Sequence, residues 1–177
     1  MAINENLLST FMAKNPDLSF ALEESFPLKS IYPNAAPLGP LLELGVQDVQ
    51  NSFTRQTAAQ AVNYWNDMAQ QFLSDAESPA DSPARLTYAK MAAAQAALLA
   101  DHQYGAEAEQ AYRVAIQIAR ANPEAGYGLA QNLATTGRAD EARELVADFE
   151  HAHPSKDPAP GWKFIYSAGG GGQAPHP

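Results

Sequence analysis

Two consecutive stretches of equal length decide the fold: AKMAAAQAALLADHQYGAEAEQAYRVAIQIARAN at residues 89–122 and PEAGYGLAQNLATTGRADEARELVADFEHAHPSK at residues 123–156. When the second is laid over the first at an offset of 34 residues, small and apolar residues coincide. The matched pairs are Ala96 with Ala130, Leu99 with Leu133, and Ala108 with Ala142. Self-similarity at a fixed period indicates one supersecondary unit that stacks on its own copy.

Each stretch has the pattern of two helices separated by a short break. Glycine or proline punctuates the chain at Tyr104-Gly105, Asn122-Pro123 and Thr136-Gly137. We therefore expect four helices, over residues 84–102, 105–120, 123–136 and 139–152. The recurring alanines have a physical reason, because antiparallel helices approach closely only where their side chains are small.

The period and the small residues resemble the tetratricopeptide repeat family. That family has small residues at its eighth and twentieth positions, which are Ala96 and Ala108 here, and Ala130 and Ala142 in the second unit. The resemblance implies tandem antiparallel helix hairpins, an α-α superhelix, over residues 84–154. It also implies a protein–protein interaction module and not an enzyme.

The sequence departs from the family pattern at several positions: the usual eighth-position glycine is alanine in both units, and Arg120 replaces the proline that closes the first unit. The aromatic fourth position holds Ala92 in the first unit and Gly126 in the second. The twenty-seventh position, usually alanine, holds Ala115 and then Phe149. The resemblance implies that this position faces the next repeat, so Phe149 is free to be large at the end of the array. Terminal repeats need a cap over their apolar face, and Trp162 or Phe164 could fold back to supply it.

The N-terminal region also has helical periodicity. Apolar residues recur at spacings of three and four over 3–14 and, most strongly, over 52–77. We expect these two helices, a further turn or two over 18–25 and a short helix over 41–49.

A proline-rich segment interrupts these helices at residues 26–40. Its four prolines restrict the backbone, and its apolar side chains distinguish it from a disordered linker. We expect an ordered, extended strap on a helical surface. The predicted fold is thus all-α, with an N-terminal helical region and strap over 1–80, tandem repeats over 84–154 and a flexible tail over 155–177.

Composition excludes several classes of function. The chain has 11 Lys+Arg against 20 Asp+Glu, a net charge of −9, and no cysteine. No segment is strongly basic, so we expect no nucleic-acid partner. The lack of cysteine removes disulfides, zinc ribbons and thiol catalysis. No apolar run approaches the roughly 20 residues of a membrane span, and the N-terminus lacks the order of a signal peptide. We therefore expect no membrane insertion and a cytoplasmic location, or an extracytoplasmic one if the chain is a fragment of a membrane protein.

No group of residues predicts catalysis. Acidic residues such as Asp140 and Glu141 stand at a predicted helix start, where negative charge is favourable. The pair His151 and His153 would point apart on a helix, and no further ligand is spaced for a metal. We expect no catalytic residue, no metal and no cofactor.

A binding surface is the remaining candidate site. Stacked hairpins of this kind have a concave face lined by their first helices, here 84–102 and 123–136. Residues on these helices that packing does not require are Tyr88, Lys90, Gln95, Tyr127, Gln131 and Asn132. Polar and aromatic groups suit peptide recognition. Alternatively, the strap at 26–40 fills this groove from within the chain.

Two functions follow. The first is a scaffold or adaptor that binds a peptide or protein partner, with Tyr88 and Tyr127 exposed along an open groove. For the second, the stretches Asn15-Pro16-Asp17-Leu18-Ser19-Phe20 and Ala36-Pro37-Leu38-Gly39-Pro40 resemble the soluble C-terminal part of large bacterial membrane proteins. That resemblance implies an accessory domain or subunit packed permanently on a larger, membrane-associated bacterial assembly. An apolar patch should then appear on Phe20, Phe26, Ile31 and Tyr32.

Overall fold

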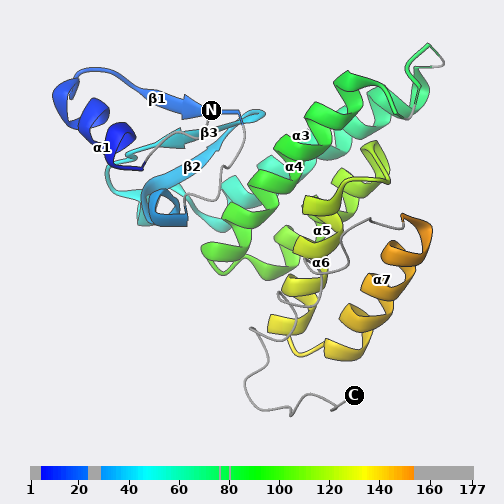
Figure 1. Cartoon of the computed structure of the whole chain (residues 1–177). Helices are drawn as coiled ribbons and strands as arrows, with labels where there is room; N and C mark the ends of the chain where they lie inside the picture. The colour runs from blue at the N-terminus through cyan, green and yellow to red at the C-terminus, as the bar shows by residue number, and fades with distance from the viewer. Residues whose placement is uncertain (1–4, 24–28, 76, 80, 154–177) are drawn as a thin grey trace.

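The computed structural model describes residues 5–23, 29–75, 77–79 and 81–153 (Figure 1). An N-terminal region with a small sheet precedes a series of helices. In chain order the elements are α1 (Glu5–Lys14), β1 (Phe20–Leu22), the 3-10 helix η1 (Lys29–Asn34), β2 (Ala35–Leu38), β3 (Leu41–Leu44), α2 (Val49–Ser52), α3 (Arg55–Ser74), α4 (Pro83–Asp101), α5 (Gly105–Ile118), α6 (Pro123–Thr135) and α7 (Ala139–Ala152).

The four predicted repeat helices are present, as α4 to α7. Helix α4 packs against α5, and α6 against α7, as two consecutive antiparallel hairpins (Figure 1). Both first helices begin with proline after a polar cap. The Ser82 side chain accepts a hydrogen bond from the backbone N–H of Arg85, and the Asn122 side chain accepts one from Ala125. Proline suits this position because the first turn has no partner for its N–H.

The backbone conformation of the hairpin turns also repeats with the period of 34 residues. Each hairpin turn has a residue with positive φ, Gln103 at 66° and Gly137 at 87°. Helix α4 ends two residues before Gln103, and α6 ends two residues before Gly137. Equivalent backbone hydrogen bonds close both turns. The N–H of Tyr104 donates to the Leu99 carbonyl at 2.9 Å, and the N–H of Arg138 donates to the Leu133 carbonyl at 2.8 Å. Such left-handed caps satisfy the last carbonyls of a helix. The repeat predicted from side chains therefore also governs how the chain turns.

The matched alanines lie inside the hairpins. Ala96, Ala108 and Ala142 are fully buried, and Ala130 is almost so. Their small side chains let the second helix of each hairpin approach the first, as the sequence predicted.

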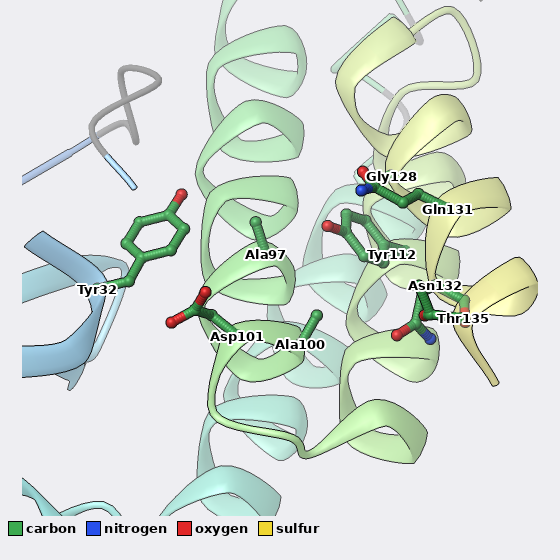
Figure 2. Close-up of a pocket in the computed structure, with 9 residues that line it drawn as sticks. All are labelled: Tyr32, Ala97, Ala100, Asp101, Tyr112, Gly128, Gln131, Asn132 and Thr135. Carbon is green, nitrogen blue, oxygen red and sulfur yellow. The ribbon is translucent and has the colours of Figure 1, made fainter. Parts of the chain in front are cut away.

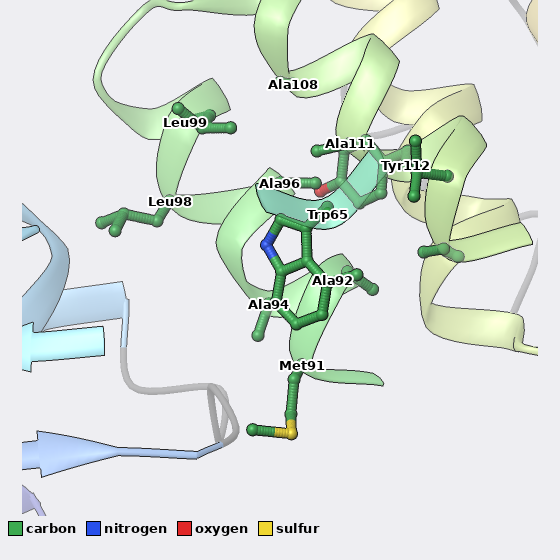
Figure 3. Packing of buried hydrophobic residues seen from close by; sticks show 14 of the residues in the cluster. Trp65, Met91, Ala92, Ala94, Ala96, Leu98, Leu99, Ala108, Ala111 and Tyr112 are labelled. Carbon is green, nitrogen blue, oxygen red and sulfur yellow. The ribbon is translucent and has the colours of Figure 1, made fainter. Parts of the chain in front are cut away.

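Helix α4 is the centre of the molecule (Figure 3). Six consecutive residues, Met91 to Ala96, are buried, so the middle of the helix has no side facing water. Helices α3, α5 and α6 surround it, and β2, β3 and η1 also contact it. A helix that is apolar on all sides is typical of such a central position.

The N-terminal region contains a three-stranded antiparallel sheet in the order β1-β3-β2. The helix predicted over 18–25 is therefore wrong, and so is the one over 41–49, which is β3 followed by α2. Buried Leu42 and Leu44 alternate with less buried neighbours, which is the period of a strand. Gly39, with φ of 57°, turns the chain between β2 and β3.

The predicted strap at 26–40 is not one extended segment. Residues 24–28 lie outside the described part, as do the tail from 154 and the possible cap residues Trp162 and Phe164. The remainder of the strap forms η1, β2 and the turn at Gly39. The fold is thus helical as predicted over the repeats, whereas the all-α description is wrong for this small sheet.

One buried side chain joins the sheet to the helices. The Gln95 amide on α4 donates to the carbonyl oxygens of Gly39 and Leu41 at 2.6 and 2.8 Å. Its Oε1 accepts a hydrogen bond from Trp65 Nε1 on α3 at 2.9 Å. This arrangement fixes the β2–β3 hairpin against α4 and therefore places η1 beside the first helices.

Candidate binding groove between the first helices

A cavity of about 310 Å³ lies between the first helices of the two hairpins (Figure 2). Helices α4 and α6 form its walls, α5 contributes one side chain from behind, and η1 borders one side. The lining residues are Tyr32, Ala97, Ala100, Asp101, Tyr112, Gly128, Gln131, Asn132 and Thr135.

Small residues on the walls create this space. Ala97 and Ala100 face it from α4, and Gly128 faces it from α6 (Figure 2). A Cβ atom at Gly128 would come within 2.3 Å of the Tyr112 ring. Glycine is therefore required here by close approach, and the buried ring of Tyr112 occupies the place that a larger residue at 128 would take.

Two tyrosines bring hydroxyl groups to the cavity. Figure 2 shows Tyr32 and Tyr112 pointing their hydroxyl ends toward the face of α4 that carries Ala97. Burial raises the pKa of Tyr112, and the nearby Tyr32 raises it further. Tyr112 is therefore a neutral hydroxyl at physiological pH. The Tyr32 carbonyl oxygen lies 2.7 Å from His102 Nε2, which fixes η1 at the end of α4.

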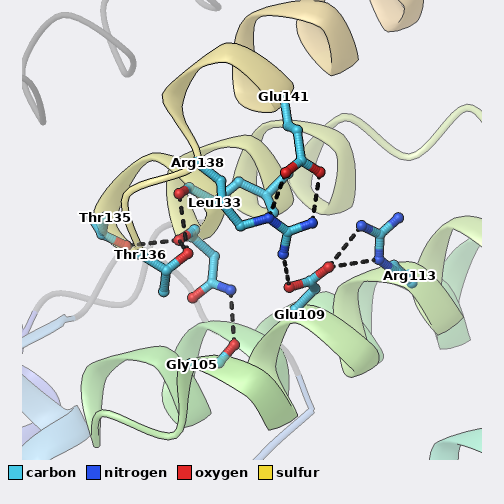
Figure 4. Close-up of polar contacts among 9 residues, drawn as sticks. Gly105, Glu109, Arg113, Leu133, Thr135, Thr136, Arg138 and Glu141 are labelled. Atoms are coloured by element: carbon cyan, nitrogen blue, oxygen red, sulfur yellow. Dashed lines mark hydrogen bonds and ion pairs between the residues drawn. The ribbon is translucent and has the colours of Figure 1, made fainter.

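The polar side chains of α6 have different roles. Buried Asn132 donates to the Gly105 carbonyl at 2.9 Å and so ties α6 to the start of α5 (Figure 4). Thr135 donates its hydroxyl to the Asn132 carbonyl at 2.9 Å. Gln131 is half-buried, and no hydrogen bond joins its side chain to another described residue. Gln131 is thus the amide of the cavity that is available to a ligand.

Three of the six predicted binding residues are on α4, and all three lie away from this cavity. Gln95 is fully buried and belongs to the contact between sheet and helices, so its prediction as a surface residue is wrong. Tyr88 is half-buried, with its ring centre 5.2 Å from that of Phe72 on α3. Lys90 is exposed but does not line the cavity. The sequence could not show which face of α4 the helix α3 covers.

The other three predicted residues are on α6, and two of them line the cavity. These are Gln131 and Asn132. Tyr127 packs instead against Phe149 at 5.5 Å between ring centres. Burial raises the pKa of Tyr127, and so does Glu150, whose carboxylate contacts the hydroxyl.

Several lining residues were missed by the sequence analysis. Asp101 and Thr135 occupy equivalent places in the two repeats, 34 residues apart. Ala97 lies one helical turn before Asp101, and Gly128 lies two turns before Thr135. This spacing was the signal in the sequence that could have identified these residues as part of the lining. Tyr32 had none, because only the β2–β3 hairpin and His102 bring η1 to this position.

Phe149 also corrects a prediction. Its ring lies over Gly126, where an added Cβ atom would be 2.9 Å from its Cδ2. Phe149 therefore packs inside its own hairpin and not toward a following repeat. The aromatic ring that the family places at Gly126 is supplied here from the opposite helix.

An ion-pair network lies between α5 and the α6–α7 hairpin (Figure 4). Glu109 contacts Arg113 at 2.7 Å and Arg138 at 2.6 Å, and Arg138 also contacts Glu141 at 2.6 Å. Partial burial opposes ionisation of Glu109, but its hydrogen bonds to the two arginines and their charges outweigh burial and lower its pKa. This network joins the two repeats and contains no member of the cavity lining.

The described residues contain neither a metal-binding cluster nor a membrane-spanning helix. No three His, Cys, Asp or Glu side chains there are placed to hold a metal ion. None of the helices in that part of the chain combines the length and the apolar character needed to cross a membrane.

Comparison with known proteins gives one result. Neither the curated proteins nor the solved structures contain a significant match to the chain. A family model described as tetratricopeptide repeat matches residues 98–159, a span that starts in the last turn of α4 and includes α5, α6 and α7. Residues 98–159 are therefore a tetratricopeptide repeat segment, which includes α5 and α6 but only the last turn of α4.

Proposed function

We propose that this chain is a protein–protein interaction module that holds a peptide segment of its partner in the groove between α4 and α6. Tetratricopeptide repeats generally mediate protein–protein interaction, and residues 98–159 match that family. The observation that carries the proposal is the cavity of about 310 Å³ on the inner face of the two first helices. Its volume is at the lower end for ligand sites, so it suits a short segment and not a folded domain.

The lining suits a peptide in both shape and hydrogen bonding. The small side chains of Ala97 and Ala100 let a peptide backbone come close to α4. The Gln131 amide can donate to a peptide carbonyl and accept from a peptide N–H. Each such bond contributes about 0.5–1.5 kcal/mol net, so a few of them with some apolar burial support weak, reversible binding.

Selection from a displayed library of random peptides tests this proposal. Gln131→Arg places a long charged side chain in the groove. Gln117→Arg makes the same change at an exposed position of α5 outside the cavity lining. The native chain and Gln117→Arg should enrich a common set of peptides, and Gln131→Arg should not. The proposal fails if the native chain enriches no peptide over Gln131→Arg.

A second candidate function rests on a separate surface. Leu7, Phe11 and Leu18 are 65%, 54% and 59% exposed around α1, and an exposed apolar patch of this kind is typical of an interface. Its place differs from the predicted one, because Tyr32 is buried and Phe20 is half-buried beneath Phe11. Nothing is described for Phe26 or for the side chain of Ile31.

This patch supports the proposal of an accessory subunit on a larger assembly. If this function is correct, the double variant Leu7→Asp with Phe11→Asp should no longer bind the partner, and Gln131→Arg should still bind it. Co-purification of the tagged chain from its native source measures this. The reverse pattern would reject the accessory function and favour the groove. The cytoplasmic location stays a prediction in either case.

A further inference from the structure

We propose that the groove selects a peptide that carries a basic side chain, lysine or arginine. This inference rests on the proposed peptide-binding function and names the chemistry of the partner. Charge, helix direction and the shape of the cavity support it.

The lining of the groove has one charged side chain, and that charge is negative. Asp101 is exposed at the end of α4, and no lysine or arginine is among the described lining residues. No ion pair joins Asp101 to a described residue. Arg113 and Arg138 are held by Glu109 on another surface, and Lys90 stands about three helical turns before Asp101. Among the side chains that the structure describes, no lysine or arginine of the lining competes with a basic ligand group for this carboxylate.

The direction of the helices adds to this negative field. Asp101 and Thr135 are the last residues of α4 and α6, and Figure 2 shows the two helices running side by side in the same direction. Each helix C-terminus is equivalent to roughly half a negative charge. An aspartate at such an end is unfavourable for its own helix, and α4 has no basic residue in its last turn to offset it. A bound cation would provide that compensation.

The shape of the cavity fits a long, narrow side chain. Ala97 and Ala100 form a smooth wall along α4, and the Tyr32 ring lies beside them (Figure 2). An aliphatic stem can pack on such a wall while its ammonium or guanidinium group reaches Asp101. Figure 2 shows the Tyr32 ring on the side of α4 to which Asp101 points, and an aromatic face attracts cations. An acidic side chain would meet Asp101 and two negative helix ends.

A double-mutant comparison tests the inference. A synthetic peptide from the library selection is titrated calorimetrically against the native chain and against Asp101→Asn, together with a version whose basic residue is replaced by glutamine. The native chain should bind the basic peptide about three- to tenfold more tightly than the neutral one, and added NaCl should reduce this preference. Asp101→Asn should bind both peptides alike.

Two controls separate this inference from the function on which it rests. Asp148→Asn, an exposed change on α7, should keep the native preference, and Asp101→Glu should keep most of it. The inference is overturned if Asp101→Asn discriminates between the peptides as the native chain does, or if the selected peptides carry no basic residue. Both outcomes leave peptide binding intact. A library that yields no peptide rejects the proposed function and this inference together.

Discussion

At the scale of single residues, Gln95 has a structural role that is unusual for glutamine, which is mostly found on protein surfaces. It is a fully buried polar residue, and its amide satisfies two carbonyl oxygens and one indole N–H from other elements. Buried polar groups are costly when they lose their partners. The residue therefore links sheet and helices in a way that an apolar side chain could not.

Gln95→Ala is expected to destabilise the protein by about 3 kcal/mol, because it leaves the buried Trp65 Nε1 without its partner and removes the hydrogen bonds to the carbonyl oxygens of Gly39 and Leu41. Urea denaturation measures the free energy of unfolding. The matched change Gln131→Ala, at a half-buried glutamine without such bonds, should cost less than about 1 kcal/mol. Equal costs for the two variants would contradict the role assigned to Gln95.

Gly128 gives a prediction whose sign depends on a second residue. Gly128→Ala should destabilise by about 1–3 kcal/mol, since its Cβ would collide with the buried Tyr112 ring. In a Tyr112→Ala background the ring is absent, and alanine should then stabilise α6 through its better helix propensity, by about 1 kcal/mol. Thermal or urea unfolding of the four proteins completes the cycle. The same cost in both backgrounds would rule out the collision.

At the scale of elements, the sequence predicted the repeat helices and failed in the N-terminal region. Ala108 and Ala142 revealed the repeat because close helix packing imposes a small residue at a fixed period. The strands could not be found in the same way. β1 has only three residues and β3 only four, and runs this short do not distinguish a strand from a helical turn by periodicity.

The groove was predicted at the correct pair of helices but with only part of its lining. Gln131 and Asn132 were placed correctly on α6. Gln95 and Tyr88 were misplaced because the face of α4 that α3 and the sheet cover depends on tertiary contacts. Neighbouring residues on the same helix gave no sign of those contacts.

Phe149 gives a prediction about how far the last hairpin is a separate unit of stability. Phe149→Ala should remove the ring that covers Gly126 and cost about 2 kcal/mol, less than for a fully buried aromatic because it is half-buried. Hydrogen exchange should then quicken in α6 and α7 and remain nearly unchanged in α3. Phe72→Ala, a half-buried ring between α3 and α4, should show the opposite distribution. Uniform acceleration in both variants would contradict a separable hairpin.

At the scale of the whole molecule, two surfaces differ in whether their charged side chains are paired. Arginines and glutamates pair between the repeats around Glu109, whereas the groove retains only Asp101. The first arrangement joins the two hairpins, and the second is the one that we propose for a basic partner. The network pairs two glutamates with two arginines and is therefore neutral, so the net charge of −9 comes from acidic residues outside it.

The inter-repeat network gives a pH dependence. The pKa of Glu109 is lowered in the folded state, so its stabilisation is present above the ordinary value of 4.5 and disappears as the pH falls through the lowered value. The stability difference between the native chain and Glu109→Gln should therefore exist at neutral pH and shrink below pH 4.5. Urea unfolding across this range measures it. Glu144→Gln, at an exposed glutamate of α7 with no ion pair to a described residue, should show no such trend, and a similar trend in both would contradict the network.

Mapping of a bound peptide by amide chemical shifts tests the central claim most directly. A peptide selected by the native chain is titrated into the isotope-labelled protein, and each shift change is assigned to its residue. The account predicts that the largest changes fall along the groove, at Ala97, Gly128 and Gln131, with little change around Leu7 and Phe11 on α1. Changes concentrated on α1, with the groove unaffected, would contradict it.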